Sequence, residues 1–250
     1  MKQRLADYVV DFLVNKGVTD CFTVVGGGWL DSIPMFIVSG QVRYDTTARY
    51  AERFTDGLPL RAVGDQEFDI TKSVDCMCKY AAMLEDPKDI RYMLEKGWRL
   101  AATGRRGPVW IDIPVNFQGG FIETEELRGY DPAEDDALLP PAVSEDTIDT
   151  ILELIAGAKR PVIYAGGGIR LSEGYDAFRA VIEKLGVPVV TYWNSIDLIE
   201  EAHPLYCGRG GNMGDRAGNF AVQNADLLLA IGTRISIRQV GYNWKTWARE

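Results

Sequence analysis

The sequence predicts an α/β fold made of two parallel-sheet domains of the Rossmann-like, doubly wound type, both of them incomplete. Three observations lead to this prediction. Buried apolar runs alternate with segments of helical period, several of these runs end in glycines, and an acidic, proline-containing stretch separates two such series. Strands that alternate with helices favour right-handed βαβ units and therefore parallel sheets. A chain of 250 residues is long enough for two hydrophobic cores.

The first domain begins with a helix and two apolar strands. Residues 5–16 carry apolar side chains at helical spacing and end before Gly17, a residue suited to a helix C-terminus. Residues 18–25 predict a buried strand that ends in three glycines, and residues 33–38 predict another. Two parallel strands need a crossover of a dozen or more residues, and this junction is too short. We therefore expect a missing segment between residues 28 and 29.

The rest of the first domain alternates loop, helix and strand. Residues 43–69 are polar and predict mostly loop, residues 70–80 and 87–103 predict helices, and residues 109–113 predict a buried strand stopped by Pro114. This first domain covers residues 1–118. Residues 119–144 are acidic and have no period, which is typical of an interdomain linker.

The second domain covers residues 145–250 and repeats the alternation. A helix begins after Ser144 and runs to about residue 158. Strands are predicted at 161–165, 188–192 and 227–231, and further helices at 173–185 and 217–224. No closing strand follows the last of these, so we expect a domain truncated at its C-terminus.

Composition narrows the function classes. The formal charge is −9, from 27 basic and 36 acidic residues, which argues against nucleic acid or an anionic membrane as a partner. No apolar run is long enough to span a membrane, and no signal peptide is evident, so we expect a cytoplasmic protein. The four cysteines form no CxxC pair, and the single histidine, His203, excludes a site with several histidine ligands.

Three glycine-rich stretches are candidate binding loops. Residues 26–28 and 166–168 each follow a predicted strand, and ligands of open α/β sheets bind at the carboxyl ends of strands. Residues 208–216 form a longer glycine loop whose two arginines suit a diphosphate. The alternatives are ordinary glycine turns for the first two and a flexible surface loop for the third.

Several segments together resemble a known family. VVGGG, WLDSIPMFIVSGQV, GDQEFDI, KYAAMLEDP and GRRGPVWIDIPVNFQ occur in that order, followed by RPVIYAGGGI and GDRAGNFAVQNADLLLAIGTR. The order resembles the pyrimidine-binding and central domains of thiamine diphosphate (TPP) enzymes, and is most similar to acetolactate-synthase-like carboligases. The resemblance implies decarboxylation of a 2-keto acid such as pyruvate, transfer of a hydroxyethyl unit to a carbonyl acceptor, and a homodimer or tetramer.

The resemblance also implies site residues. Near the TPP site or a dimer contact it places Gly26, Gly27, Gly28, Gln41, Gln66 and Lys79. Some relatives bind FAD on the central domain, which implies contacts from Gly166, Gly167, Gly168, Gly208, Gly210, Gly214, Arg216, Gly232 and Arg234. The family's activating glutamate belongs to the stretch missing after residue 28, and the sequence has no Gly-Asp-Gly motif for Mg²⁺ and diphosphate. We therefore expect no catalytic residue, no metal ligand and no activity in this chain alone.

Two other interpretations remain open. The chain could be a non-catalytic module that binds an FAD- or ADP-type nucleotide, or an interaction partner. It could also be a product of mis-joined coding segments with no stable first sheet, because such a sheet would lack internal strands and expose its edges.

Overall fold

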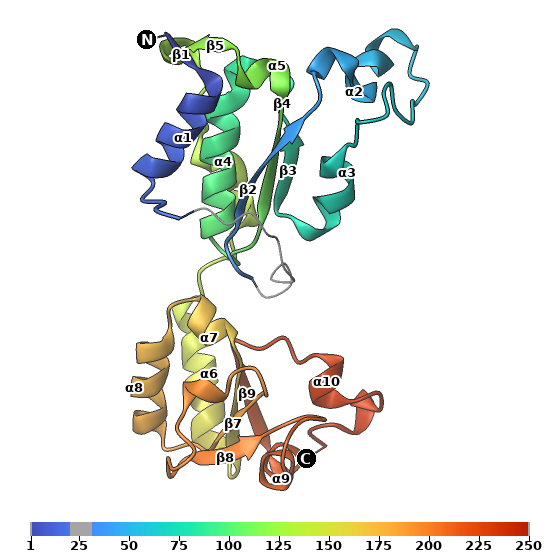
Figure 1. Ribbon diagram of the computed structural model, residues 1–250. Coiled ribbons are helices and arrows are strands. Elements are labelled where there is room, and N and C mark those ends of the chain that lie inside the picture. Colours follow the sequence, from blue (N-terminus) through green and yellow to red (C-terminus); the bar gives the residue numbers. More distant parts are fainter. Residues whose placement is uncertain (1, 21–31, 250) are drawn as a thin grey trace. The chain divides into compact units, whose positions relative to one another are not determined.

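The computed structural model describes residues 2–20 and 32–249 (Figure 1). The chain divides into two compact units, Met1–Pro140 and Pro141–Glu250. Both units contain parallel sheets with helices packed on them, so the predicted α/β class is confirmed. Among the described residues, no helix is both long and apolar enough to cross a membrane.

The described residues of the first unit form a three-stranded parallel sheet. β2 (Phe36–Gln41), β4 (Val109–Pro114) and β3 (Tyr80–Met83) lie in the order β2-β4-β3. Helices α1 (Leu5–Asn15) and α4 (Ile90–Ala102) pack on one face, where their buried side chains meet those of β4. Figure 1 shows α3 (Ile70–Val74) on the other side of this sheet.

Shorter elements complete the first unit. β1 (Lys2–Arg4) and β5 (Phe121–Glu123) form an antiparallel pair. The remaining short helices and 3-10 turns are η2 (Tyr44–Thr46), α2 (Ala48–Ala51), η3 (Glu52–Phe54), η4 (Asp75–Met77), η5 (Pro87–Asp89), α5 (Val115–Gln118), η6 (Thr124–Glu126) and η7 (Pro132–Leu138). Residues 43–69, expected to be mostly loop, thus contain only single helical turns.

The prediction of one helix over residues 70–80 was wrong. α3 ends at Val74, a 3-10 turn follows, and β3 begins at Tyr80. The Ala-Ala-Met run has a helical propensity, but pairing with β4 outweighs that weak preference. The strand expected at 18–25 is irregular at residues 18–20, and its remainder lies outside the described residues, as does the junction between residues 28 and 29.

The acidic stretch that we predicted to be a linker contains β5, η6 and η7. Three consecutive acidic residues of η7, Glu134 to Asp136, pair with one face of α4. Glu134 accepts a hydrogen bond from the Tyr92 hydroxyl at 2.7 Å, and Asp135 lies 3.1 Å from the Lys96 amine. Positions 92, 96 and 99 share one helix face, so successive acidic residues can reach successive turns. We call residues 132–138 the acidic strap.

The second unit has a four-stranded parallel sheet in the order β8-β7-β6-β9. Its elements are α6 (Glu145–Gly157), β6 (Pro161–Ala165), α7 (Gly168–Leu171), α8 (Tyr175–Leu185), β7 (Val189–Thr191), η8 (Ile196–Leu198), β8 (Tyr206–Arg209), α9 (Arg216–Asn224), β9 (Leu227–Ile231), α10 (Ile237–Val240) and η9 (Trp244–Thr246). The Ser144 side chain caps α6 by accepting from the Thr147 amide, as its position predicted.

Alternate residues of β6 and β7 enter two separate cores. Ile163 and Val189 pack with Ile182 of α8, whereas Tyr164 and Val190 pack with Val222 of α9. A strand buried on both faces is typical of a doubly wound sheet. β8 was not predicted, because the strand has only four residues and overlaps the start of a glycine-rich loop.

Candidate functional site

The carboxyl edge of the first sheet holds a buried polar group. Asp112 of β4 is fully buried and lies opposite Ser39 of β2. Its carboxylate accepts hydrogen bonds from Ser39 Oγ at 2.6 Å and from Gln41 Nε2 at 2.9 Å. Burial raises the pKa of Asp112, the two hydrogen bonds act in the opposite direction, and the charge of Asp69 raises it further. Asp112 was not among the residues predicted from the sequence.

Gln41, a predicted cofactor-site residue, is committed to protein contacts. Its Nε2 donates to Asp112 and also to the carbonyl oxygen of Phe68 at 2.7 Å. Its Oε1 accepts from the Val42 amide at 2.9 Å. An amide NH₂ has two protons, and both are used here. The buried side chain therefore connects strand and loop and has no proton left to donate to a ligand.

Gln66 belongs to the segment that Gln41 holds. It is exposed and lies two residues before Phe68. The neighbouring Glu67 accepts from the backbone amides of Ala48 and Val63, the second at 2.7 Å, and so closes this segment on itself. The structure thus brings Gln41 and the segment of Gln66 to the same edge of the sheet.

The cations near this edge are neutralised by carboxylates. Arg49 lies 2.9 Å from Asp69 and 3.2 Å from Glu85, and Arg53 lies 2.6 Å from Glu85. Burial and a hydrogen bond to Glu85 raise the pKa of Tyr44 to about 12. Because their charges are already paired, these arginines do not form a ready site for a diphosphate.

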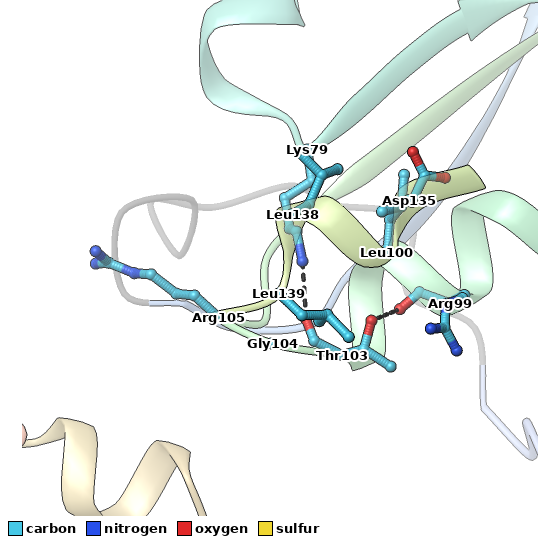
Figure 2. Close-up of a pocket in the computed structure, with 9 residues that line it drawn as sticks. All are labelled: Lys79, Arg99, Leu100, Thr103, Gly104, Arg105, Asp135, Leu138 and Leu139. Atoms are coloured by element: carbon cyan, nitrogen blue, oxygen red, sulfur yellow. Dashed lines mark hydrogen bonds between the residues drawn. The ribbon is translucent and has the colours of Figure 1, made fainter. Parts of the chain in front are cut away.

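Lys79 lies at the amino ends of the parallel strands, whereas Gln41 lies at their carboxyl ends. It directly precedes β3, whereas Gln41 ends β2, and both strands run parallel to β4. Lys79 Nζ donates to the carbonyl oxygen of Thr103 at 2.8 Å, just after the last turn of α4 (Figure 2). A cation at a helix C-terminus is a stabilising arrangement. Burial lowers the pKa of Lys79.

A small cavity lies beside Lys79. It has a volume of about 100 Å³, and Leu100, Leu138 and Leu139 form its apolar wall. Figure 2 shows the Arg105 side chain directed away from it, where its Nε donates to Ser32. The structure therefore does not bring Lys79 together with Gln41 and Gln66.

In the second unit, the Gly166–Gly168 loop packs against the end of β9. The Gly168 amide donates to the Gly232 carbonyl at 2.8 Å, and Gly232 has a left-handed φ of 63°. A Cβ built on Gly166 or Gly168 would stand 2.5 or 2.6 Å from that same carbonyl oxygen. These glycines allow two backbone segments to approach each other, and the Gly166 and Gly168 amides already donate to the carbonyl oxygens of Ile231 and Gly232.

The Gly208–Gly214 loop is also filled by the chain. Asp215 caps α9, accepting from the amides of Gly218 at 2.9 Å and Arg209 at 3.0 Å. Burial raises the pKa of Asp215, but these two hydrogen bonds hold it below its ordinary value. A carboxylate thus already stands where a helix N-terminus would bind an anion. The remaining predicted FAD contacts of this loop and of the β9 end are Gly210, packed on Tyr164, and the exposed Arg216 and Arg234.

The described residues hold no cluster of three or more His, Cys, Asp or Glu side chains that could bind a metal ion. His203 has a structural environment. Its Nδ1 accepts from the Leu205 amide at 3.2 Å, so Nε2 donates to Glu183 at 2.8 Å. Gly26, Gly27 and Gly28 lie outside the described residues.

Comparison with known proteins identifies the relatives. Residues 148–250 match the central domain of thiamine pyrophosphate enzymes. The chain is 34% identical over 230 residues to the acetolactate synthase large subunit of Corynebacterium glutamicum, covering 90% of this chain and 34% of that protein. It is 31% identical to the acetolactate synthase isozyme 1 large subunit of Escherichia coli, covering 90% of this chain and 37% of that protein. It is also 31% identical to the acetolactate synthase large subunit of Lactococcus lactis, covering 93% of this chain and 38% of that protein.

The matches support a thiamine pyrophosphate-dependent family of the acetolactate-synthase-like group. The chain spans about a third of the length of the curated relatives it matches. The resemblance inferred from the sequence is therefore confirmed.

Proposed function

We propose that this chain is part of an acetolactate-synthase-like carboligase, which decarboxylates a 2-keto acid such as pyruvate and transfers the two-carbon unit to a carbonyl acceptor. The observation that carries the proposal is similarity to acetolactate synthase large subunits over 90% of the chain. Thiamine pyrophosphate, when bound, supplies the carbanion chemistry of such enzymes, and the protein supplies binding and orientation.

The described residues contribute a scaffold for the site and do not fit the cofactor by themselves. The cations at the carboxyl edge are paired with carboxylates, and the sequence has no Gly-Asp-Gly motif to bind Mg²⁺ and diphosphate. These observations support a site completed by residues that this chain does not supply, within a homodimer or tetramer. They also support a central domain in which the two glycine loops serve packing, which disfavours FAD or ADP at these loops.

An exchange of domains tests the carboligase proposal. Residues 141–250 would replace the segment with which they align in the E. coli isozyme 1 large subunit, and acetolactate formation from pyruvate would be measured. Retention of activity is expected, because the transplanted domain matches the central domain of this family. A chimaera that folds, by circular dichroism, yet is inactive would contradict the proposal.

A titration tests whether this chain is active alone. We expect no release of carbon dioxide above the cofactor background with pyruvate, thiamine pyrophosphate and Mg²⁺, while the E. coli enzyme under the same conditions turns over. Substantial turnover by the chain would show that its catalytic groups are present after all. Binding of FAD or ADP without affinity for thiamine pyrophosphate would favour the nucleotide-binding module instead.

A further inference from the structure

We propose that Asp112 is a positioning residue. Its buried carboxylate fixes the orientation of the Gln41 amide, and Gln41 then holds the 64–69 segment against the carboxyl edge of the first sheet. The connection consists of two hydrogen bonds from one NH₂ group, 2.9 Å to Asp112 and 2.7 Å to the Phe68 carbonyl.

The chemistry of a carboxylate makes this orientation unique. An ionised carboxylate accepts hydrogen bonds and donates none, so only the NH₂ end of the Gln41 amide can face Asp112. The oxygen end then faces the Val42 amide, from which it accepts at 2.9 Å. A flipped amide would place acceptor against acceptor at Asp112 and donor against donor at Val42, and would leave the Phe68 carbonyl without this donor.

The second oxygen of Asp112 is fixed as well. Ser39 donates to it at 2.6 Å, and the Ser39 hydroxyl in turn accepts from the Trp110 indole at 2.7 Å. Asp112 interrupts an apolar strand, between the buried Ile111 and Ile113. Burial of a charge at such a position destabilises the fold. The best-attested role of buried polar groups is to fix the arrangement of their neighbours.

The 64–69 segment is also attached through Asp69, which pairs with Arg49, and Arg49 pairs with Glu85 just after β3. Glu67 accepts hydrogen bonds from the backbone amides of Ala48 and Val63, which belong to the same connection between β2 and α3, residues 43–69. The Gln41 bond to Phe68 is therefore a direct link between the segment and strand β2. Under the proposed function, on which this step rests, the segment would carry the exposed Gln66 toward the cofactor side, and Gln41 would act on the site through it.

Amide hydrogen exchange on the 250-residue chain tests the proposal without any cofactor. The reporters are the Val42 amide, bonded to Gln41, and the Val63 amide, bonded to Glu67. The Leu84 amide, bonded to the Asp112 backbone carbonyl, reports on the sheet. Asp112→Asn turns one of the two acceptor ends of this side chain into a donor, so position 112 no longer dictates which end of the Gln41 amide faces it. We expect exchange at Val42 and Val63 to become at least about tenfold faster, with Leu84 nearly unchanged.

Two further variants separate positioning from general stabilisation. Ser39→Ala removes the other bond to Asp112 and leaves Gln41 in place, so it should not accelerate exchange selectively at Val63. Asp112→Asn with Gln41→Glu again fixes the direction of the hydrogen bond between positions 112 and 41 but offers no donor to Phe68. We expect this double variant to recover the unfolding midpoint and not the protection at Val63.

Uniform acceleration at all three amides, or none at Val63, in Asp112→Asn would overturn the proposal. Should that variant fail to fold, Gln41→Met, which keeps the length and removes both donors, must give the same selective loss. Because no cofactor is involved, failure here leaves the carboligase proposal intact, and an inactive chimaera leaves the positioning role intact.

Discussion

Replacement of Gly166 by alanine tests whether the chain itself fills the glycine loop of the second unit. The added methyl group would stand 2.5 Å from the Gly232 carbonyl oxygen and 2.6 Å from Thr233 Cβ. Carbon atoms in ordinary contact are about 3.5–4.0 Å apart, so two backbone segments would have to separate by roughly 1 Å. Overpacking of this kind typically costs about 1–3 kcal/mol.

Urea denaturation followed by circular dichroism would measure the effect. With a slope near ~2 kcal/mol per molar urea, the midpoint of the second unit should fall by about 0.5–1.5 M. Gly157→Ala is the matched control, because nothing lies within 4 Å of a Cβ built at this last residue of α6. Its midpoint should stay the same or rise, since alanine is the better helix former.

An unchanged midpoint in Gly166→Ala would refute the reasoning. The position of the missing Cβ would then be open space, and the loop could accommodate part of a ligand. The close packing at Gly166 would then no longer disfavour a nucleotide at this loop.

Three further substitutions have defined outcomes. Lys79→Met removes the donor to Thr103 at the end of α4, and a loss of about 0.5–1.5 kcal/mol in the free energy of unfolding is expected from chemical denaturation. Asp135→Asn should cost about 1–3 kcal/mol by the same assay, because its partner Lys96 is also largely buried; a loss near zero would show that the acidic strap is not held by this pair. Asp215→Asn should cost about 1 kcal/mol at pH 7 through its helix cap. Since the pKa of Asp215 is below its ordinary value, the wild-type advantage should shrink as the pH falls below about 4, and a constant difference from pH 7 to pH 3 would contradict that shift.

The helices and central strands could be predicted because local signals agree with the tertiary structure. Ser144 marks the start of α6, and the apolar runs at 161–165 and 227–231 form the adjacent strands β6 and β9. β3 could not be predicted from propensity, because only its pairing with β4 determines that Tyr80 begins a strand.

The site was predicted less completely than the fold. Resemblance named Gln41 as a candidate, but a residue type at a position does not show that Asp112 and the Phe68 carbonyl use its protons. Asp112 had a usable signal, a single acidic residue inside the buried run Val109–Pro114. Lys79 could not be assigned to its edge of the sheet while residues 70–80 were taken for a helix.

The strand order of the first sheet constrains when that sheet can form during synthesis. β4 is the last of its three described strands to be made, yet it lies between the other two. At about 5–20 residues per second, β2 would wait about 4–15 s before its neighbour leaves the ribosome. Among the described strands, a nascent chain that stops short of residue 109 has β2 and β3 without the strand that joins them. These three strands therefore assemble in one late step instead of one after another.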